Sequence, residues 1–248
     1  FSKHYRITGG DAPGVYGIRV QGGEMGLKLD ALSTNFEVDH VEVFNQGFAG
    51  IMAKTDPTCD DRTIRENFTM RDVSLHDNYV HDTGGEGFYI GNSFWDGMER
   101  SCGKRLPHEI RGLKVFNNVI KNTGWEAIQV GCAIEGSEIY NNTIHNYGTA
   151  NKLYQNNGIQ IGAGTGGLLH NNLIKNGPGN GLIMMGTGDN VVYNHIIVNA
   201  GENGIFCDER YTPGEGFKFV NNTILSPKQD GIRLYAELVP MNSIINNI

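Results

Sequence analysis

Four side chains that can take part in acid–base chemistry recur at related places in the sequence. Glu86 and Glu126 each stand directly before a short Gly-apolar-x-apolar element, in which alanine once replaces the glycine, and Tyr89 stands at its third position. Lys54 follows an earlier copy of the same element. A phenol or an ammonium group can exchange a proton with a substrate, whereas two carboxylates can divide the roles of acid and base or bind a cation together. These groups can cooperate only if the copies of the element lie side by side.

Two elements alternate along the chain. The first reads YGIRV, AGIMA, EGFYI, EAIQV, NGIQI, NGLIM, NGIFC and DGIRL, and the second reads VFNNVI, IYNNTI, LHNNLI, FVNNTI and IINNI. A repeat without insertions has roughly 23 to 30 residues, enough for two or three short strands but too few for a strand-helix crossover. Stacked copies would pair each strand with its equivalents about 4.8 Å above and below. The repeat therefore predicts an all-β fold, a parallel β-helix with loop insertions, as a single domain over residues 1–248.

The alternation of apolar and polar residues assigns faces to these strands. In NGIQIG, Ile159 and Ile161 are expected to point into the core, and Asn157 and Gln160 are expected to point outward. A third register holds amides and one acid, which we interpret as an internal ladder of side chains bonded to one another and to the bends. This register comprises Asn45, Asp82, Asn122, Asn146, Asn176 and Asn199.

The pattern resembles the right-handed parallel β-helix repeats of the pectate-lyase-like superfamily, over residues 14–248. The resemblance implies a single-stranded right-handed coil and a polysaccharide or oligosaccharide partner, because the superfamily includes polysaccharide lyases, mannuronan epimerases and several glycoside hydrolases. YGIRVQGG, at residues 16–23, has Arg19 and Gln21 where the epimerases carry an acid and a histidine. The DD and GHG motifs of polygalacturonase-like hydrolases are also missing. The resemblance thus implies the fold and leaves the chemistry open.

The outward positions predict a groove for a sugar chain. Its densest patch holds Lys54, Glu86, Tyr89 and Glu126 as catalytic candidates. Amides and carboxylates bond hydroxyl groups, flat rings cover sugar faces, and glycine at the next outward position would keep the surface low. We predict that the substrate-binding residues are Arg19, Trp95, Gln129, Gln160, Asp208 and Arg210.

Two insertions interrupt the repeat on the same side of the coil. TDPTCDDRTIRENF begins directly after Lys54, and NSFWDGMERSCGKRLPHEIRG begins at residue 92. Loops of this length in a compact domain usually carry function, so Trp95 is expected to form a wall beside the patch. Cys59 and Cys102 lie in these insertions and can pair with each other, or Cys102 can pair with Cys132. Either disulfide would indicate an oxidising compartment.

Three functions are open for the patch. The favoured one is a lyase-like enzyme for an acidic polysaccharide, which needs a base for the C5 proton, an acid for the leaving oxygen and a cation for the carboxylate. Lys54 or Tyr89 would exchange the protons, and Arg19 or a Ca²⁺ ion held by Glu86 and Glu126 would neutralise the carboxylate. A glycoside hydrolase would instead use the two glutamates as a retaining pair roughly 5 to 5.5 Å apart. A glycan-binding or structural surface module would need no reacting group.

The composition restricts the partners. The 248 residues carry a net charge of −7, and the sequence shows no basic face that would bind nucleic acid. No apolar run approaches the length of a membrane span, so no membrane insertion is expected. The chain begins at Phe1 without an initiator Met and ends within the repeat. We interpret it as part of a longer secreted protein of bacterial type, extracellular or at the cell surface.

Overall fold

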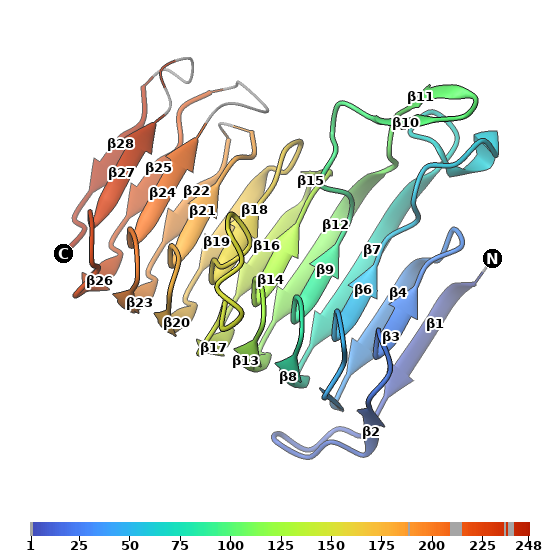
Figure 1. Ribbon diagram of the computed structural model, residues 1–248, viewed down its shortest axis with the longest axis horizontal. Helices are drawn as coiled ribbons and strands as arrows, with labels where there is room; N and C mark the ends of the chain where they lie inside the picture. Colours follow the sequence, from blue (N-terminus) through green and yellow to red (C-terminus); the bar gives the residue numbers. More distant parts are fainter. Residues whose placement is uncertain (1, 188, 209–214, 236, 238–240) are drawn as a thin grey trace.

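The chain winds into a parallel β-helix of about nine turns, and Figure 1 shows its strands stacked from the N-terminal to the C-terminal end. The computed structural model describes residues 2–187, 189–208, 215–235, 237 and 241–248. Within these residues the one helical segment is the short 3-10 helix η1 (Asp61–Thr63), and no helix is long and apolar enough to cross a membrane. The predicted all-β parallel β-helix with loop insertions is confirmed.

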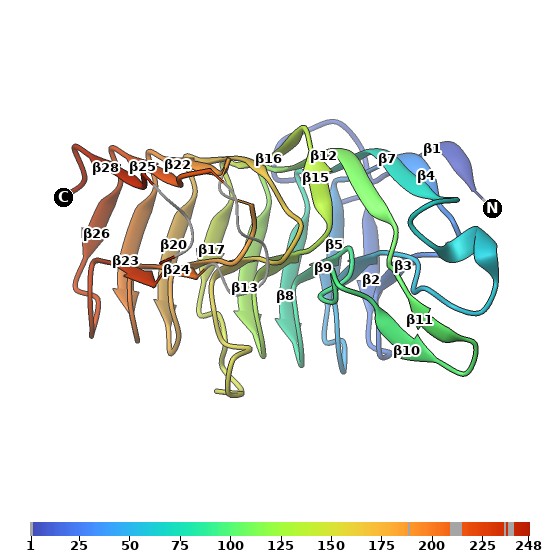
Figure 2. The ribbon, with the colours of Figure 1, turned by 90° about the horizontal axis from the view of Figure 1, so that it is seen from above.

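Successive turns add strands to the same three parallel sheets, which lie on different sides of the coil (Figure 2). Sheet A contains β1 (Lys3–Thr8), β4 (Thr34–Asp39), β7 (Thr69–His76), β12 (Glu109–Phe116), β15 (Ala133–Glu135), β16 (Ser137–Tyr140), β19 (Gly167–His170), β22 (Val191–Tyr193), β25 (Lys218–Val220) and β28 (Ser243–Ile245). Sheet B contains β2 (Ile18–Gln21), β5 (Val41–Phe44), β8 (Tyr79–Thr83), β13 (Val119–Thr123), β17 (Thr143–His145), β20 (Leu173–Gly177), β23 (Ile196–Ala200) and β26 (Thr223–Leu225). Sheet C contains β3 (Leu27–Leu29), β6 (Ile51–Ala53), β9 (Phe88–Ile90), β14 (Ile128–Val130), β18 (Ile159–Ile161), β21 (Leu182–Met184), β24 (Ile205–Asp208) and β27 (Ile232–Tyr235).

The recurring glycine lies where the chain enters sheet C, and close packing between turns explains it. A Cβ atom on Gly158 would lie 2.4 Å from the carbonyl oxygen of Gly181 in the next turn and 2.6 Å from Cγ2 of Ile174 in sheet B. Beyond the glycine, the two apolar residues of each strand point inward, and Ile159 pairs in register with Ile128 and Leu182 in a fully buried row. The glycine and the alternation together place each strand of sheet C.

The first copy of the repeat belongs to a different sheet from the one predicted. Residues of YGIRV form β2, which pairs with β5 in sheet B, so Ile18 lies beside Val41. The first strand of sheet C is β3, in which Lys28 pairs with Met52. The two sheets are easily confused because Gly17 also marks a close approach, where a Cβ atom would lie 2.0 Å from the carbonyl oxygen of Gly9.

Two asparagine ladders stabilise the bends on either side of sheet B. The internal ladder is formed by the second asparagine of the Asn-Asn element: Asn118 Nδ2 donates to Asn142 Oδ1 at 3.0 Å, and Asn142 Nδ2 donates to Asn172 Oδ1 at 2.9 Å. The predicted register also forms a ladder, since Asn146 Nδ2 donates to Asn122 Oδ1 at 3.1 Å, but this bond is exposed. The interpretation of that register as internal is therefore wrong. Its residues adopt positive φ at an outer bend, where short polar side chains are tolerated.

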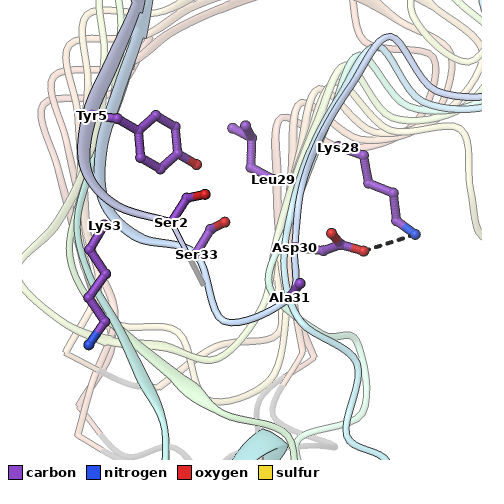
Figure 3. A pocket seen from close by; sticks show the side chains of 8 residues that line it. All are labelled: Ser2, Lys3, Tyr5, Lys28, Leu29, Asp30, Ala31 and Ser33. Atoms are coloured by element: carbon purple, nitrogen blue, oxygen red, sulfur yellow. Dashed lines mark ion pairs between the residues drawn. The ribbon is translucent and has the colours of Figure 1, made fainter.

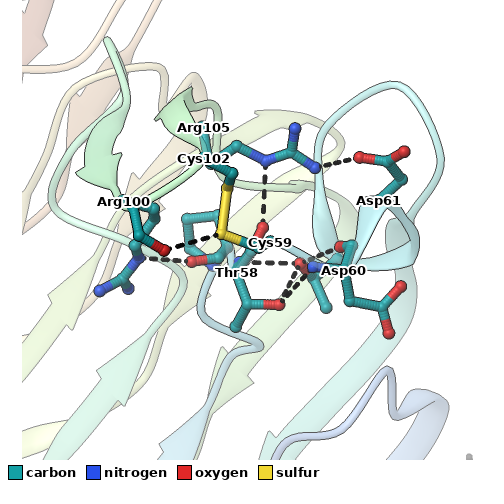
Figure 4. Close-up of a disulfide and its surroundings, with 10 residues drawn as sticks. Thr58, Cys59, Asp60, Asp61, Arg100, Cys102 and Arg105 are labelled. Atoms are coloured by element: carbon teal, nitrogen blue, oxygen red, sulfur yellow. Dashed lines mark hydrogen bonds and ion pairs between the residues drawn. A yellow bond between two sulfur atoms is a disulfide. The ribbon is translucent and has the colours of Figure 1, made fainter.

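The two insertions lie on the same side of the coil, as predicted, and they also pack against each other. The second contains the antiparallel hairpin of β10 (Met98–Arg100) and β11 (Gly103–Arg105). A disulfide joins Cys59 to Cys102, so the first of the two predicted pairings is present, while Cys132 is a buried free thiol (Figure 4). Arg100 Nε donates to the carbonyl oxygen of Pro57 at 2.8 Å, which fixes the hairpin on the first insertion.

Two cavities lie away from the predicted site. One of about 620 Å³ is at the N-terminal end of the coil, where Tyr5 and Leu29 point toward each other across the interior (Figure 3). Another, of about 520 Å³, follows the exposed asparagine ladder past Asn122, Asn146 and Asn176. Neither cavity is lined by a predicted catalytic residue.

Candidate functional site

Three of the predicted residues form one line on the outer face of sheet C. Tyr89 of β9 pairs in register with Gln129 of β14, which pairs with Gln160 of β18. Each is the middle residue of a three-residue strand whose two neighbours are buried in the core, so the middle side chain must point outward. The structure thus brings these three side chains together as expected.

Hydrogen bonds connect this line to the second insertion. Gln160 Nε2 donates to Gln129 Oε1 at 3.1 Å, and Gln129 Nε2 donates to Ser93 Oγ at 2.8 Å. Ser93 Oγ also lies 3.3 Å from the Tyr89 hydroxyl. The two glutamines are only 3% and 7% exposed, whereas Ser93 is exposed and Tyr89 is half-buried. A ligand would therefore meet Tyr89 and Ser93 first, with the glutamines holding them in place.

Lys54 lies against the ring of Tyr89. Its Nζ atom is 4.2 Å from the ring centroid and 2.9 Å from Oδ1 of Asp56, and the residue is 9% exposed. Burial acts to lower the pKa of Lys54, but Tyr89 and Asp56 outweigh it and hold the pKa above its ordinary value. Lys54 is therefore a cation at neutral pH and is better suited to binding an anion than to accepting a proton.

Glu86 and Glu126 do not line an open groove, so the prediction that they point outward is wrong. They lie at the bend between sheets B and C, where they are 1% and 0% exposed. Asn157 and Asn180 continue their row: Asn157 Nδ2 donates to Glu126 Oε1 at 3.2 Å, and Asn180 Nδ2 donates to Asn157 Oδ1 at 2.9 Å. The alternation rule fails here because it applies within an extended strand and these residues stand at a bend.

Burial favours the protonated form of these carboxyl groups. It raises the pKa of Glu86 to about 7 and that of Glu126 to about 8, and the charge of Glu86 adds to the effect on Glu126. One oxygen of each carboxyl group, Oε2, has no hydrogen-bond partner. The pair is enclosed, so a sugar cannot reach it as the arrangement stands.

The two glutamates also do not fit the predicted Ca²⁺ site. Calcium takes six to eight oxygen ligands, and no third acidic or histidine ligand from the described residues joins Glu86 and Glu126. The group of this kind that the described part of the chain contains is Glu37, Asp39 and His76 in sheet A. Arg6 Nε lies 2.7 Å from Asp39 and 3.1 Å from Glu37, so these acids already have a cation.

An aromatic cluster beside Tyr89 was not predicted. The ring of Phe48 meets the rings of Tyr89 and Trp125 edge to face, with centroids 6.2 and 5.3 Å apart. Gly85 makes room for this contact, since a Cβ atom there would lie 2.7 Å from the Phe48 ring. Lys152 Nζ lies 3.4 Å from the centroid of Trp125. The sequence could have indicated this cluster, because Phe48 and Trp125 each stand two positions before the glycine position of the repeat.

The remaining predicted ligands are dispersed. Arg19 lies on sheet B, where it pairs with Glu42, so its predicted place in the line with Tyr89 is wrong. Trp95 lies in the second insertion with the Arg65 guanidinium 3.7 Å from its ring centroid, and the ring also packs against Gly164.

At the far end of sheet C, Asp208 is buried at the end of β24. It is several turns from Tyr89 and fully buried, so the prediction that it binds a substrate at the surface is wrong. Arg210 lies outside the described residues.

Comparisons with known proteins agree with this architecture. The family described as "Right handed beta helix region" matches residues 108–248, more than half of the chain. No curated protein and no solved structure shows a significant match. The match bears out the predicted handedness of the coil.

Proposed function

Because the chain belongs to the right-handed β-helix family, whose members share a coil and differ in chemistry, we propose its function from the site: a carbohydrate-active protein that cleaves an acidic polysaccharide by β-elimination. One observation carries the proposal. A buried ammonium group, Lys54, lies 4.2 Å from the ring of a half-buried tyrosine whose hydroxyl meets Ser93 at the surface. A cation beside a proton-exchanging group is what elimination from a uronic acid requires.

In this proposal Lys54 exchanges its partner Asp56 for the carboxylate of the sugar and stabilises the negative charge that develops when the C5 proton leaves. Tyr89, with its hydroxyl deprotonated, takes the C5 proton. The electron pair of the C5–H bond forms the C4–C5 double bond while the bond from C4 to the glycosidic oxygen breaks, and Tyr89 returns the proton to that leaving oxygen. Ser93 holds the Tyr89 hydroxyl in position, supported in turn by Gln129. Arg19 has no part in this scheme because it lies on another sheet.

Of the two alternative functions considered from the sequence, the geometry disfavours the hydrolase and favours the glycan-binding module. A hydrolase that uses Glu86 and Glu126 is disfavoured, because both carboxyl groups are enclosed. A glycan-binding module is the second candidate, and the joined rings of Phe48, Tyr89 and Trp125 favour it, since sugar faces pack on aromatic rings. Binding alone would need no proton transfer at Tyr89.

The disulfide supports a proposed location outside the cytoplasm. Disulfides persist in oxidising compartments and are rare in the reducing cytosol. The Cys59–Cys102 bond therefore fits a secreted or cell-surface protein that meets its polysaccharide there.

The experiment is a screen of uronic-acid and neutral polysaccharides that measures both ultraviolet absorbance from unsaturated ends and total reducing ends. We expect absorbance with an acidic polymer, and a loss of about 100-fold or more in Tyr89→Phe, the scale of general acid–base catalysis. Tyr193→Phe is the matched control, because Tyr193 stacks on His170 in sheet A, away from the site. Reducing ends without absorbance would indicate hydrolysis, and retention of a polymer without product would indicate a binding module.

A further inference from the structure

We propose that Lys152, held on the ring of Trp125, forms a second anion-binding subsite next to Lys54, so that two cations take the carboxylates of an acidic oligosaccharide. The class of ligand rests on the function proposed above. The subsite itself rests on the geometry of the loop between β17 and β18. The sequence analysis did not predict that this loop takes part in the site.

The loop fixes Lys152 above Trp125. Gly148 N donates to the carbonyl oxygen of Trp125 and Ala150 N to that of Gly124, both at 3.0 Å, so the base of the loop is fastened to the chain around the indole. The Nζ atom then lies 3.4 Å from the ring centroid. The side chain is exposed and makes no ion pair with any residue in the described part of the chain. The ring holds the ammonium group in place and leaves N–H groups free for a ligand.

A continuous run of aromatic rings connects the two lysines. Lys54 Nζ lies 4.2 Å from the centroid of Tyr89, the ring of Phe48 meets both Tyr89 and Trp125, and Lys152 Nζ lies 3.4 Å from the centroid of Trp125. The positive charges of both lysines act to lower the pKa of Glu86. Burial nevertheless raises that pKa to about 7, and that of the adjoining Glu126 to about 8. Burial thus reduces the negative charge that the two glutamates carry at neutral pH. Asp56 pairs with Lys54, whereas Lys152 makes no ion pair with another residue in the described part of the chain.

The surroundings favour a sugar acid over other anions. Nucleic acid is densely charged and would be repelled by a protein with a net charge of −7 and no basic face. An acidic oligosaccharide carries fewer charges and has apolar faces that can pack on Phe48 and Trp125, which link the two lysines. Leu153 and Tyr154, next to Lys152, are 73% and 78% exposed and extend this surface.

Calorimetric titration tests the subsite with tetrasaccharides of galacturonate, mannuronate and guluronate at pH 6, each beside its methyl ester. Because the substitution removes a charge-assisted hydrogen bond, we expect Lys152→Met to weaken binding of an acidic tetrasaccharide at least tenfold. Binding of the neutral ester should not change. Lys121→Met is the matched control, because Lys121 lies 5.5 Å over Tyr79 on another sheet, and it should alter neither affinity.

The outcomes separate this inference from the proposed function. If Lys54→Met weakens binding and Lys152→Met does not, the second subsite is wrong and the Lys54–Tyr89 site stands. An equal loss for the acid and its ester would mean that Lys152 acts by packing, which also overturns the subsite. If the wild type binds none of the acidic tetrasaccharides, both proposals fail.

Discussion

At the scale of single residues, the glutamates in the bend behave as members of an amide ladder. Each asparagine of that row donates its side-chain N–H toward the preceding turn and accepts from the following one, as Asn180 and Asn157 do. A carboxylate can only accept, so Glu126 takes the hydrogen bond from Asn157 and needs a proton to continue the row toward Glu86. The raised pKa of both groups agrees with this requirement.

The pair should therefore make folding depend on pH. The folded-state pKa values of about 7 and 8 lie above the ordinary 4.5, so the folded chain binds more protons and loses stability as pH rises from 4.5 through 8. The slope is about 1.4 kcal/mol per pH unit for each proton. We expect Glu126→Gln, which keeps both donor and acceptor, to flatten this dependence in urea unfolding at pH 5, 7 and 9. Glu99→Gln, at an exposed site, serves as the control, and equal slopes in the wild type and Glu126→Gln would refute the idea.

The internal asparagine ladder has one substitution, His195. Its Nδ1 accepts the backbone N–H of Asn172 at 3.3 Å, but its Nε2 is buried without a hydrogen-bond partner. Burial lowers the pKa of His195 to about 4, so the wild type loses stability as pH falls from about 6.5 toward 4. We expect His195→Asn to raise the free energy of unfolding by about 1 kcal/mol at pH 7, and by more at pH 5. Thermal and urea unfolding test this, and Asn172→His should have the opposite effect.

At the scale of elements, the sequence could place strands but not bends. Strands such as Ile159–Ile161 follow from a glycine forced by close packing and from strict alternation, which are local properties. Glu86 and Glu126 stand where the alternation ends, so their burial depended on the path of the bend. The contact of Phe48 with Trp125 crosses two turns and requires a glycine between them, which no single repeat reveals.

The disulfide should stabilise the two insertions more than the coil. Cys59 and Cys102 are 43 residues apart, and in the chain-entropy model such a loop is worth up to about 4 kcal/mol. Bonds from Arg100 to Pro57 and from Arg105 to Thr58 also join the insertions, so we expect a smaller loss. The Cys59→Ser/Cys102→Ser variant should expose this region to proteolysis and leave the far-ultraviolet circular dichroism of the coil unchanged. An unaltered proteolysis pattern would show that the arginine bonds are sufficient.

At the scale of the whole molecule, the net negative charge opposes the binding of an acidic polymer. Binding therefore has to depend on the positive charges at the site itself. A chain with a net charge of −7 repels an acidic polymer at long range, and salt screens this repulsion over a Debye length of about 8 Å. Lys54 and Lys152 act at contact distance, and Lys54 is also largely buried, so salt screens its charge less. The site can bind an anion despite the net charge because the two effects act over different distances.

The stacked architecture predicts how stability is distributed along the coil. In the sheets each strand pairs only with strands of adjacent turns, so stability is approximately a sum of turn and interface contributions, and a turn with one neighbour opens more easily. Ile244 and Ile245 in the last turn are 51% and 49% exposed, whereas Ile144 in the central strand β17 is fully buried. We expect hydrogen exchange followed by mass spectrometry to be slowest in β12, β13 and β14 and fastest in the last turn.

Ile144→Ala should cost about 2–5 kcal/mol and speed exchange mainly in β13 and β20, which pair with β17, with much less effect in β1. Ile244→Ala provides the comparison at the end of the coil. Equal acceleration in every turn after Ile144→Ala would mean that the coil unfolds as one cooperative unit.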